Sequence, residues 1–311
     1  MNQNDADYMA GQMVYSEFAG HESHGLRRLP EYLDRATSGE TNVRPNTSIE
    51  VDTGSLVRMN GDRGFGHVIM RDATALLVDR AKAHGISAVA VRNSDFAGRF
   101  VDFCEYAAER GVITLMFFNS GGGAKVAGPA GALEPRLSTN PIAAGIPKAH
   151  GPHIVLDMAT TAVAMGRVSE WRDRGEAIPQ SWVNEAGVLQ FMAGPKGLGL
   201  ALLAEALAGA LSGAGSVSDE APTDSQGIFM IGINVSALQP LTKFTAEVDT
   251  FVDYVKNTPL ARGAEPIRIP GESSATNTAA RRSTGVELQA FTLEKVQQIA
   301  TKYGVLLTSS I

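Results

Sequence analysis

The sequence has one cysteine, few aromatic residues and no apolar run long enough to cross a membrane. The single cysteine, Cys104, excludes an internal disulfide and is typical of a reducing compartment. The longest apolar stretch, over residues 198–211, is interrupted by Glu205 and is shorter than the roughly 20 residues of a membrane span. The first residues are polar and acidic, unlike a signal peptide. We therefore expect a cytoplasmic protein that does not enter a membrane.

A strong excess of one charge is missing as well. Lysine and arginine number 27 against 33 aspartates and glutamates, and they form no basic stripe, so nucleic acid is not an expected partner. The six histidines form no His-Glu-x-x-His pattern and no cysteine pair exists, so no metal site is predicted. The Gly-x-Ser-x-Gly elbow of serine hydrolases is also absent. Enzyme classes built on a metal or a serine nucleophile therefore find no support in the sequence.

The 311 residues are enough for roughly two domains. Apolar residues recur at helical spacing over residues 67–84 and Gly85 follows, which predicts a helix and its end. The β-branched run over residues 86–91 predicts a buried strand. A helix over residues 99–110 and a strand over residues 112–118 then complete a β–α–β stretch, which predicts an α/β core.

The same criteria predict further helices and strands elsewhere. They cover residues 7–18, 28–37, 154–157, 198–211, 228–235, 244–256 and 292–303. Because the segment over residues 198–211 is almost entirely apolar, it is expected to be a central core helix.

The most informative segment sets a histidine, arginines and a tyrosine within ten residues. His24 can move a proton near neutral pH, and Arg28 can bind a carboxylate through two hydrogen bonds. This combination suits an enzyme acting on a small carboxylate. From the spacing alone, a solvated helix end is the more usual explanation of such a segment.

Two glycine patterns bear on nucleotide binding. Gly64-Phe65-Gly66 lacks the third glycine of the dinucleotide fingerprint, because residue 69 is isoleucine. Lys196 stands among glycines at a predicted helix start, where backbone N–H groups and the helix dipole favour an anion. That segment is interpreted either as a phosphate site or as an ordinary start of a helix.

Taken together, these segments resemble the type 2 malate/L-lactate dehydrogenase family, which also contains ureidoglycolate, sulfolactate and diketogulonate oxidoreductases and a cyclic imine reductase. The matching motifs keep the order and spacing of the family over nearly the whole chain. They are Ser23-His24-Gly25 with Arg28 and Tyr32, Arg92-Asn93-Ser94, Thr139-Asn140-Pro141-Ile142, residues 156–161, residues 196–200, and Pro270-Gly271-Glu272.

The resemblance implies a two-domain α/β (α+β) fold that binds NAD or NADP without a Rossmann fingerprint. It implies an α/β cofactor-binding domain over residues 51–264 and a mainly helical domain built from both termini, over residues 1–50 and 265–311. It also implies a homodimer. The expected reaction is hydride exchange between the nicotinamide and a small 2-hydroxy or 2-oxo carboxylate of the malate or lactate type.

The resemblance assigns roles to individual residues. It implies that His24 acts as the acid/base and that Arg28 binds the substrate carboxylate, with Ser23 and Tyr32 beside the substrate. A further set of residues is implied to contact the cofactor. These are Ser120, Asp157, Met158, Ala159, Thr160, Lys196, Gly271 and Glu272.

The sequence departs from the family after Asn93 and Ser94, where many members carry a second histidine. Phe96 stands at that position and cannot transfer a proton, so Phe96 becomes a substrate-binding candidate and Asp95 a catalytic one. Ser138 stands where a glycine is usual. The chain also begins about one helix later than the family pattern, and the loop before Gly194 is short.

General acid/base catalysis contributes roughly 10²–10⁴-fold, so the loss of a histidine opens alternatives. The first hypothesis is a dehydrogenase of 2-hydroxy acids that relies on His24. The second is a reductase of cyclic or N-alkyl imino acids, because a protonated iminium needs less help from an acid. The third is a nucleotide-binding homologue with impaired catalysis.

Overall fold

The computed structural model describes residues 1–120, 123, 125–219 and 226–307, except the side chains of residues 170 and 173. The chain divides into two compact units. One unit is Pro45–Gly271, and the other joins Met1–Arg44 to Glu272–Ile311. The mixed α/β fold predicted from the sequence is confirmed.

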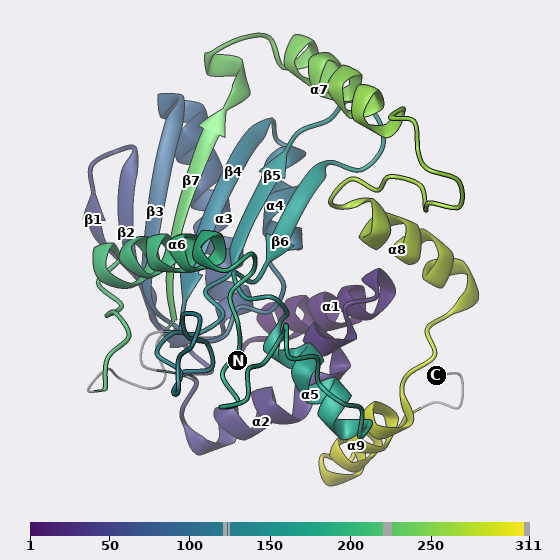
Figure 1. Ribbon diagram of the computed structural model, residues 1–311. Coiled ribbons are helices and arrows are strands. Elements are labelled where there is room, and N and C mark those ends of the chain that lie inside the picture. The colour runs from purple at the N-terminus through teal and green to yellow at the C-terminus, as the bar shows by residue number, and fades with distance from the viewer. Residues whose placement is uncertain (121–122, 124, 220–225, 308–311) are drawn as a thin grey trace. The chain divides into compact units, whose positions relative to one another are not determined.

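The unit Pro45–Gly271 is built on a seven-stranded sheet of order β1-β2-β3-β7-β4-β5-β6 (Figure 1). The strands are β1 (Ser48–Asp52), β2 (Leu56–Gly64), β3 (Ile86–Ser94), β4 (Val112–Asn119), β5 (Ile142–Ile146), β6 (Ile154–Met158) and β7 (Gln226–Asn234). β3 and β4 both run antiparallel to β7, which lies between them, so the predicted β–α–β pair is parallel but not adjacent.

Strands β2, β3, β4 and β6 all end at the same edge of the sheet. β2 runs parallel to β3, while β6 and β4 both run antiparallel to β5. We call this the carboxyl edge, defined by the strand ends Gly64, Ser94, Asn119 and Met158. Open α/β sheets commonly bind ligands outside the carboxyl ends of their strands.

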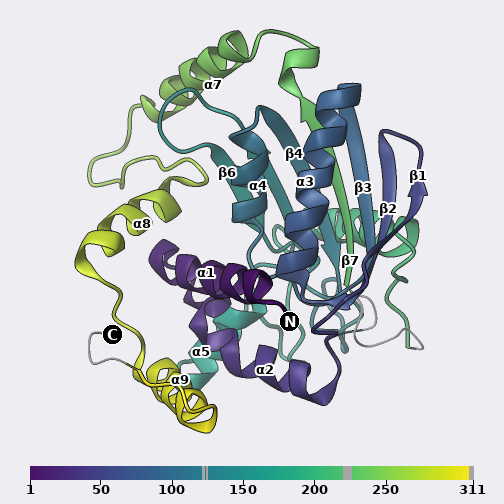
Figure 2. The ribbon, with the colours of Figure 1, turned by 180° about the vertical axis from the view of Figure 1, so that it is seen from behind.

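Helices α3 (Gly66–His84) and α4 (Val101–Ala108) cover one face of the sheet (Figure 2). In α3, residues Ile69, Ala73, Leu77 and Ala81 recur at four-residue spacing and are fully buried, as the helical pattern predicted. Cys104 of α4 is buried as well, and burial raises the pKa of its thiol. This cysteine is therefore a packing residue without thiolate reactivity.

Helix α6 (Pro195–Ala204) and the following π-helix η3 (Glu205–Leu211) lie on the opposite face (Figure 1). The helical prediction for residues 198–211 is confirmed, but the prediction of a central core helix is wrong. One side packs on strand residues such as Phe117, whereas Leu202 and Leu211 are 53% and 57% exposed. The helix covers part of the sheet face and is itself open to solvent.

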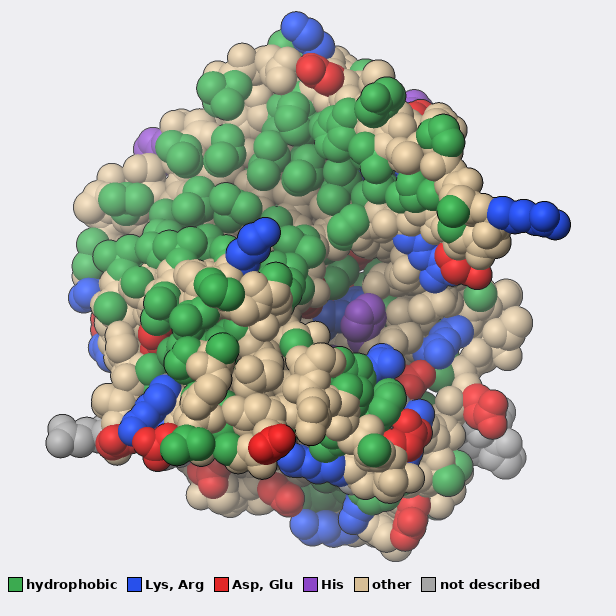
Figure 3. Space-filling view, viewed as in Figure 1, with side chains coloured by type: hydrophobic (Ala, Val, Ile, Leu, Met, Phe, Trp, Pro, Cys, Tyr) green, Lys and Arg blue, Asp and Glu red, His purple; other side chains and the backbone are tan. Residues whose placement is uncertain are grey.

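Within the described residues of this unit, no helix covers the rest of this sheet face, which is apolar. One row crosses five neighbouring strands through paired residues, in the order Ala88, Ile231, Leu115, Ala144 and Leu156. We call this surface the open sheet face. Figure 3 shows apolar side chains gathered over α6 and these strands.

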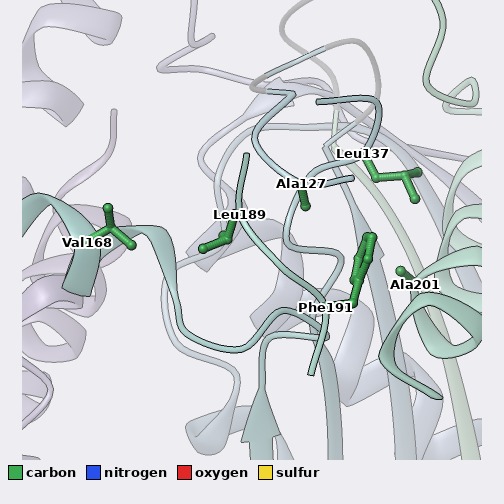
Figure 4. Packing of buried hydrophobic residues seen from close by; sticks show 6 residues of the cluster. All are labelled: Ala127, Leu137, Val168, Leu189, Phe191 and Ala201. Carbon is green, nitrogen blue, oxygen red and sulfur yellow. The ribbon is translucent and has the colours of Figure 1, made fainter. Parts of the chain in front are cut away.

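Other elements of this unit are α5 (Met165–Asp173), η4 (Val235–Ala237) and α7 (Leu241–Lys256). A second small core joins α5, α6 and the loops between β4 and α6 (Figure 4). It contains Ala127, Leu137, Val168, Leu189, Phe191 and Ala201. This cluster stabilises the loops that follow the carboxyl edge.

The unit built from both termini is helical. It contains α1 (Gln3–Ala19), η1 (Glu22–His24), η2 (Leu26–Arg28), α2 (Leu29–Ser38), α8 (Glu272–Thr284) and α9 (Ala290–Lys302). Asn2 caps α1 by accepting from Asp5 N over 2.9 Å, and Gly20 ends the helix in the left-handed region. Asn277 Nδ2 of α8 donates to Ala19 O over 3.2 Å, which joins the two ends of the chain.

Candidate active site

His24 ends the short 3-10 helix η1, directly after the turn that closes α1. Its side chain is half-buried, and Ser23 Oγ lies 3.0 Å from its Nδ1. A hydroxyl can donate to a neutral imidazole nitrogen or accept from a protonated one. Ser23 therefore orients the ring in either protonation state.

Gly25 explains how this turn is held. Glu17 of α1 is 3% exposed, and its Oε1 accepts from Leu26 N over 2.7 Å. A Cβ atom at Gly25 would lie 2.2 Å from the same oxygen, so only glycine fits. Burial raises the pKa of Glu17, while the bond from Leu26 N–H lowers it. Arg281 of α8 also contacts the turn by pairing with Glu22 over 3.1 Å.

Arg28 is paired with a neighbouring carboxylate. Its Nη1 and Nη2 each lie 3.0 Å from an oxygen of Glu31, and the two side chains are 28% and 45% exposed. The pair shows that the guanidinium can bind a carboxylate in bidentate form. Tyr32, predicted to face the substrate, is only 2% exposed within α2.

Asp95 and Phe96 follow β3 at the carboxyl edge of the sheet. Asp95 is 5% exposed, and its Oδ1 accepts from Phe96 N over 2.7 Å. The loop passes closely over His67 of α3, because a Cβ atom at Gly98 would lie 2.2 Å from His67 Nε2. Asp95 thus fixes its own loop, whereas the Phe96 side chain is half-buried.

Asp157 of β6 joins this loop through one hydrogen bond, from Phe100 N to its Oδ2 over 2.9 Å. Burial raises the pKa of Asp157 to about 6, and the Phe100 N–H group opposes the rise. Arg99 and Asp102 form a buried ion pair of 2.7 Å nearby, with side chains 2% and 8% exposed. Burial also raises the pKa of Asp102.

Thr160 and Ser120 are hydrogen-bonded to the loop between β4 and β5. Thr160 is fully buried, and both its N–H and its hydroxyl donate to Thr139 O, over 3.0 and 2.8 Å. Ser120 Oγ lies 3.0 Å from Ser138 Oγ. Between Asp157 and Thr160, residues Met158 and Ala159 are half-buried and retain exposed surface.

Lys196 is an exposed residue in the first turn of α6. The backbone groups expected beside it are partly used, because Gly197 N donates to Met192 O and Leu198 N to Gly194 O. Pro195 has no N–H. Anion binding at this helix start therefore depends mainly on the Lys196 ammonium group.

Gly271 lies beside β6. Its φ is +100°, and a Cβ atom there would lie 2.7 Å from His153 O. The preceding Pro270 O accepts from Val155 N over 3.1 Å. Glu272 is the first residue of α8 and belongs to the helical unit.

The predicted site residues thus form two groups. Ser23, His24 and Arg28 lie within one short segment of the helical unit. The second group lies at or near the carboxyl edge of the sheet, on Asp95–Phe96, Ser120 and residues 157–160. Over the ranges that the structure describes, no group of three or more His, Cys, Asp or Glu residues could hold a metal, and no helix could span a membrane.

Several polar residues of the site were not identified from the sequence. The three-residue spacing of Arg28 and Glu31 on a helix could have indicated their pairing. A lone acid such as Glu205 in an apolar helix was also a signal. The contact between Glu17 and Gly25 has no local signal, because it depends on how the chain folds back.

Comparisons with known proteins agree over most of the chain. A model of the malate/L-lactate dehydrogenase family matches residues 1–297. A malate dehydrogenase of Pyrococcus abyssi is 31% identical over 97% of this chain and 90% of its own length.

Solved structures give the same result. Malate dehydrogenase of Pyrococcus horikoshii OT3 matches with a TM-score of 0.89 at 28% identity, over 99% of this chain and 91% of its own. Delta1-piperideine-2-carboxylate reductase of Pseudomonas syringae pvar. tomato matches with a TM-score of 0.80 at 26% identity, over 96% and 94%.

The fold and these similarities define an oxidoreductase of the hydroxy acid dehydrogenase class. The chain belongs to the malate/L-lactate dehydrogenase family, as its motifs predicted. Membership implies a nicotinamide cofactor and a small carboxylate substrate.

Proposed function

We propose that the chain is an NAD- or NADP-dependent dehydrogenase of a small 2-hydroxy acid, of the malate or lactate type. The observation that carries this proposal is the half-buried His24, whose Nδ1 lies 3.0 Å from Ser23 Oγ in a turn fixed by Glu17. The family match supports it. The residues proposed to bind the dinucleotide lie mostly in the sheet unit, and His24 and Arg28 belong to the helical unit.

His24 moves the proton. Reduction of a 2-oxo acid needs a hydride at C2 and a proton at the carbonyl oxygen. Because Nδ1 faces Ser23 Oγ, the protonated ring donates from Nε2. The neutral ring that remains carries its proton on Nδ1 and donates it to Ser23 Oγ, so the orientation is preserved. Oxidation of the hydroxy acid runs in reverse.

Arg28 binds the substrate carboxylate. The bidentate geometry that it adopts with Glu31 is the geometry that a 2-oxo acid requires. Ser23 lies beside the substrate. Tyr32, buried within α2, is proposed to act on the substrate from the same segment of the chain.

The residues of the sheet unit fit a dinucleotide. When bound, the nicotinamide supplies or accepts the hydride. The exposed Lys196 ammonium suits a phosphate, with Gly271 as a further contact. Met158 and Ala159 offer half-buried surface, with Ser120 and Glu272 as further contacts. Asp157 and Thr160 hold this segment through their bonds to Phe100 N and Thr139 O.

A second candidate is an imine reductase, and Phe96 is the observation that favours it. A half-buried phenylalanine suits an apolar imino acid and provides no proton. The similarity to delta1-piperideine-2-carboxylate reductase supports this candidate. Asp95 is the alternative candidate for the proton step, and its Oδ1 accepts from Phe96 N.

The open sheet face supports a homodimer. In a single subunit its residues leave apolar surface in water, with Ile86 at 53% and Leu115 at 39% exposure. Large contiguous apolar patches on soluble proteins usually mark interfaces. A two-fold contact between two copies of this face buries both at once. A cytoplasmic location is also proposed, on the single buried cysteine.

Fluorescence titration with NADH and NADPH tests the proposed function. The wild type is expected to bind at least one of them. Lys196→Ala is expected to raise that Kd roughly 10-fold or more, because a charge-assisted contact is lost. Lys243→Ala is the matched control, since Lys243 is also exposed in the first turn of a helix. Binding of neither dinucleotide by folded wild type contradicts the proposal.

Turnover then separates the candidates. A panel of 2-oxo acids and cyclic imino acids is measured with the dinucleotide that binds. Reduction of 2-oxo acids supports the dehydrogenase, and reduction of imino acids alone supports the imine reductase. Binding without turnover on either panel supports a homologue with impaired catalysis.

A further inference from the structure

Glu205 is a buried acid at the start of the π-helix η3, with 8% of its surface exposed. Asn140 Nδ2 donates to its Oε2 over 2.8 Å, while Asn119 Nδ2 and Val217 N donate to its Oε1 over 3.1 and 2.6 Å. No lysine, arginine or histidine in the described ranges forms an ion pair with it. A buried carboxylate costs free energy unless it is fully hydrogen-bonded, so neutral amides alone hold this charge.

The two asparagine amides are fixed by their other partners. Asn119 Nδ2 also donates to Gly215 O over 3.0 Å, and Asn119 Oδ1 accepts from Gly227 N over 2.9 Å. Asn140 Nδ2 also donates to Ala201 O over 3.0 Å. Each Nδ2 faces acceptors only, which sets the orientation of both amides. The carboxylate is therefore the acceptor on which both amides converge.

The backbone around Glu205 is shaped to bring these groups together. In the π-helix, Ser212 N donates to Leu207 O, five residues earlier, over 3.2 Å. A Cβ atom at Gly227 would lie 1.8 Å from Ala208 O, so η3 touches strand β7 directly. A Cβ atom at Gly209 would lie 2.6 Å from Asn119 Nδ2. Short π segments frequently occur at functional sites.

The two asparagine donors of Glu205 lie next to segments with proposed cofactor residues. Asn119 directly precedes Ser120. Asn140 follows Thr139, whose carbonyl oxygen accepts both bonds from Thr160.

Glu205 itself continues the helix that begins beside Lys196 (Figure 1). We propose that Glu205 is a positioning residue, which holds the segments of Ser120, Thr160 and Lys196 in register to bind the dinucleotide. This inference rests on the proposed function.

The variant Glu205→Gln tests the inference with little change in volume. The NH2 group of the new glutamine side chain must face at least one of the N–H donors of Asn119, Asn140 and Val217. Because two donors cannot form a hydrogen bond with each other, the segments that carry these residues are expected to separate. We expect the Kd for NADH or NADPH to rise roughly 10-fold. Hydrogen exchange is expected to accelerate in residues 138–141 and 215–217. The control is Ser87→Ala, which removes a buried hydrogen bond of 2.7 Å from Ser87 Oγ to Leu77 O. Ser87 lies near the start of β3, at the end of this strand opposite the carboxyl edge.

The control is expected to lower the melting temperature while leaving the dinucleotide Kd and the exchange of those residues unchanged. An unchanged Kd in folded Glu205→Gln overturns the inference. If that variant does not fold, Glu205→Asp keeps the charge but shortens the reach, and the same loss of affinity is expected. If the wild type itself binds no dinucleotide, the proposed function is wrong. In that case unchanged exchange in the variant still decides against a positioning role.

Discussion

The ion pair between Arg28 and Glu31 is expected to weaken substrate binding. The exposed pair competes with a substrate carboxylate for the same guanidinium. Because exposed ion pairs are worth up to about 1 kcal/mol, Glu31→Gln is expected to lower KM for the acid substrate by roughly two- to fivefold, with kcat unchanged. Arg28→Ala is expected to raise KM instead. A higher KM in Glu31→Gln, measured by steady-state kinetics, would mean that Glu31 orients Arg28 for the substrate.

Substitutions of Phe96 are expected to distinguish a reductase of 2-oxo acids from a reductase of imines. The bond from Phe96 N to Asp95 involves only the backbone of residue 96, so it survives a change of side chain. For a 2-hydroxy acid dehydrogenase, Phe96→His is expected to raise or broaden turnover of 2-oxo acids. Phe96→Gln is the control, since it is polar but does not titrate. Equal effects of the two variants would show that polarity, and not proton transfer, is what residue 96 controls.

Asp157, near the end of strand β6, is expected to make the stability of the protein depend on pH. Burial raises the pKa of Asp157 to about 6, above the roughly 3.9 of an unfolded aspartate. Between these values the folded state binds more protons than the unfolded state, so this group's contribution to stability falls as pH rises from about 4 to 6. The loss amounts to at most about 3 kcal/mol.

Asp157→Asn removes this effect and retains an acceptor for Phe100 N. The variant and the wild type are expected to melt at similar temperatures near pH 4, with the variant more stable at pH 7. Thermal melts across this range measure the difference, to which Glu17 contributes equally in both proteins. A constant difference at every pH would contradict the raised pKa.

Elements with strong periodicity were predictable from the sequence, and elements without it were not. The helix predicted over residues 67–84 spans Gly66–His84, and the strand predicted over residues 86–91 spans Ile86–Ser94. Helix α8 was missed because its serines, threonines and asparagine give no apolar stripe. The exposure of α6 could not be predicted, since it depends on how much of the sheet one helix covers.

Motifs predicted the candidate site better than its supporting contacts. The resemblance singled out His24, and the structure adds Ser23 at 3.0 Å and the Glu17 carboxylate under Gly25. The amides that converge on Glu205 come from positions 86 and 65 residues away along the chain. Contacts of that separation follow from topology, which one sequence does not reveal.

The open sheet face predicts the oligomeric state of the whole molecule, a homodimer. Light scattering is expected to return about twice the 32.8 kDa chain mass at micromolar concentration. Leu115→Lys, in the middle of this face, is expected to shift the protein toward monomer because the charge is buried in the contact. Leu133→Lys is the control, since Leu133 is 86% exposed outside the strands. A wild-type monomer would contradict the proposed dimer.

We expect His24 to move the proton in a nicotinamide-dependent reaction. The most direct measurement compares turnover and dinucleotide binding in His24→Ala and the wild type, on the substrate that the wild type reduces best. We expect kcat to fall roughly 10²–10⁴-fold while the Kd for the dinucleotide stays within about twofold. Unchanged kcat in the variant would contradict this role of His24 and show that another group moves the proton.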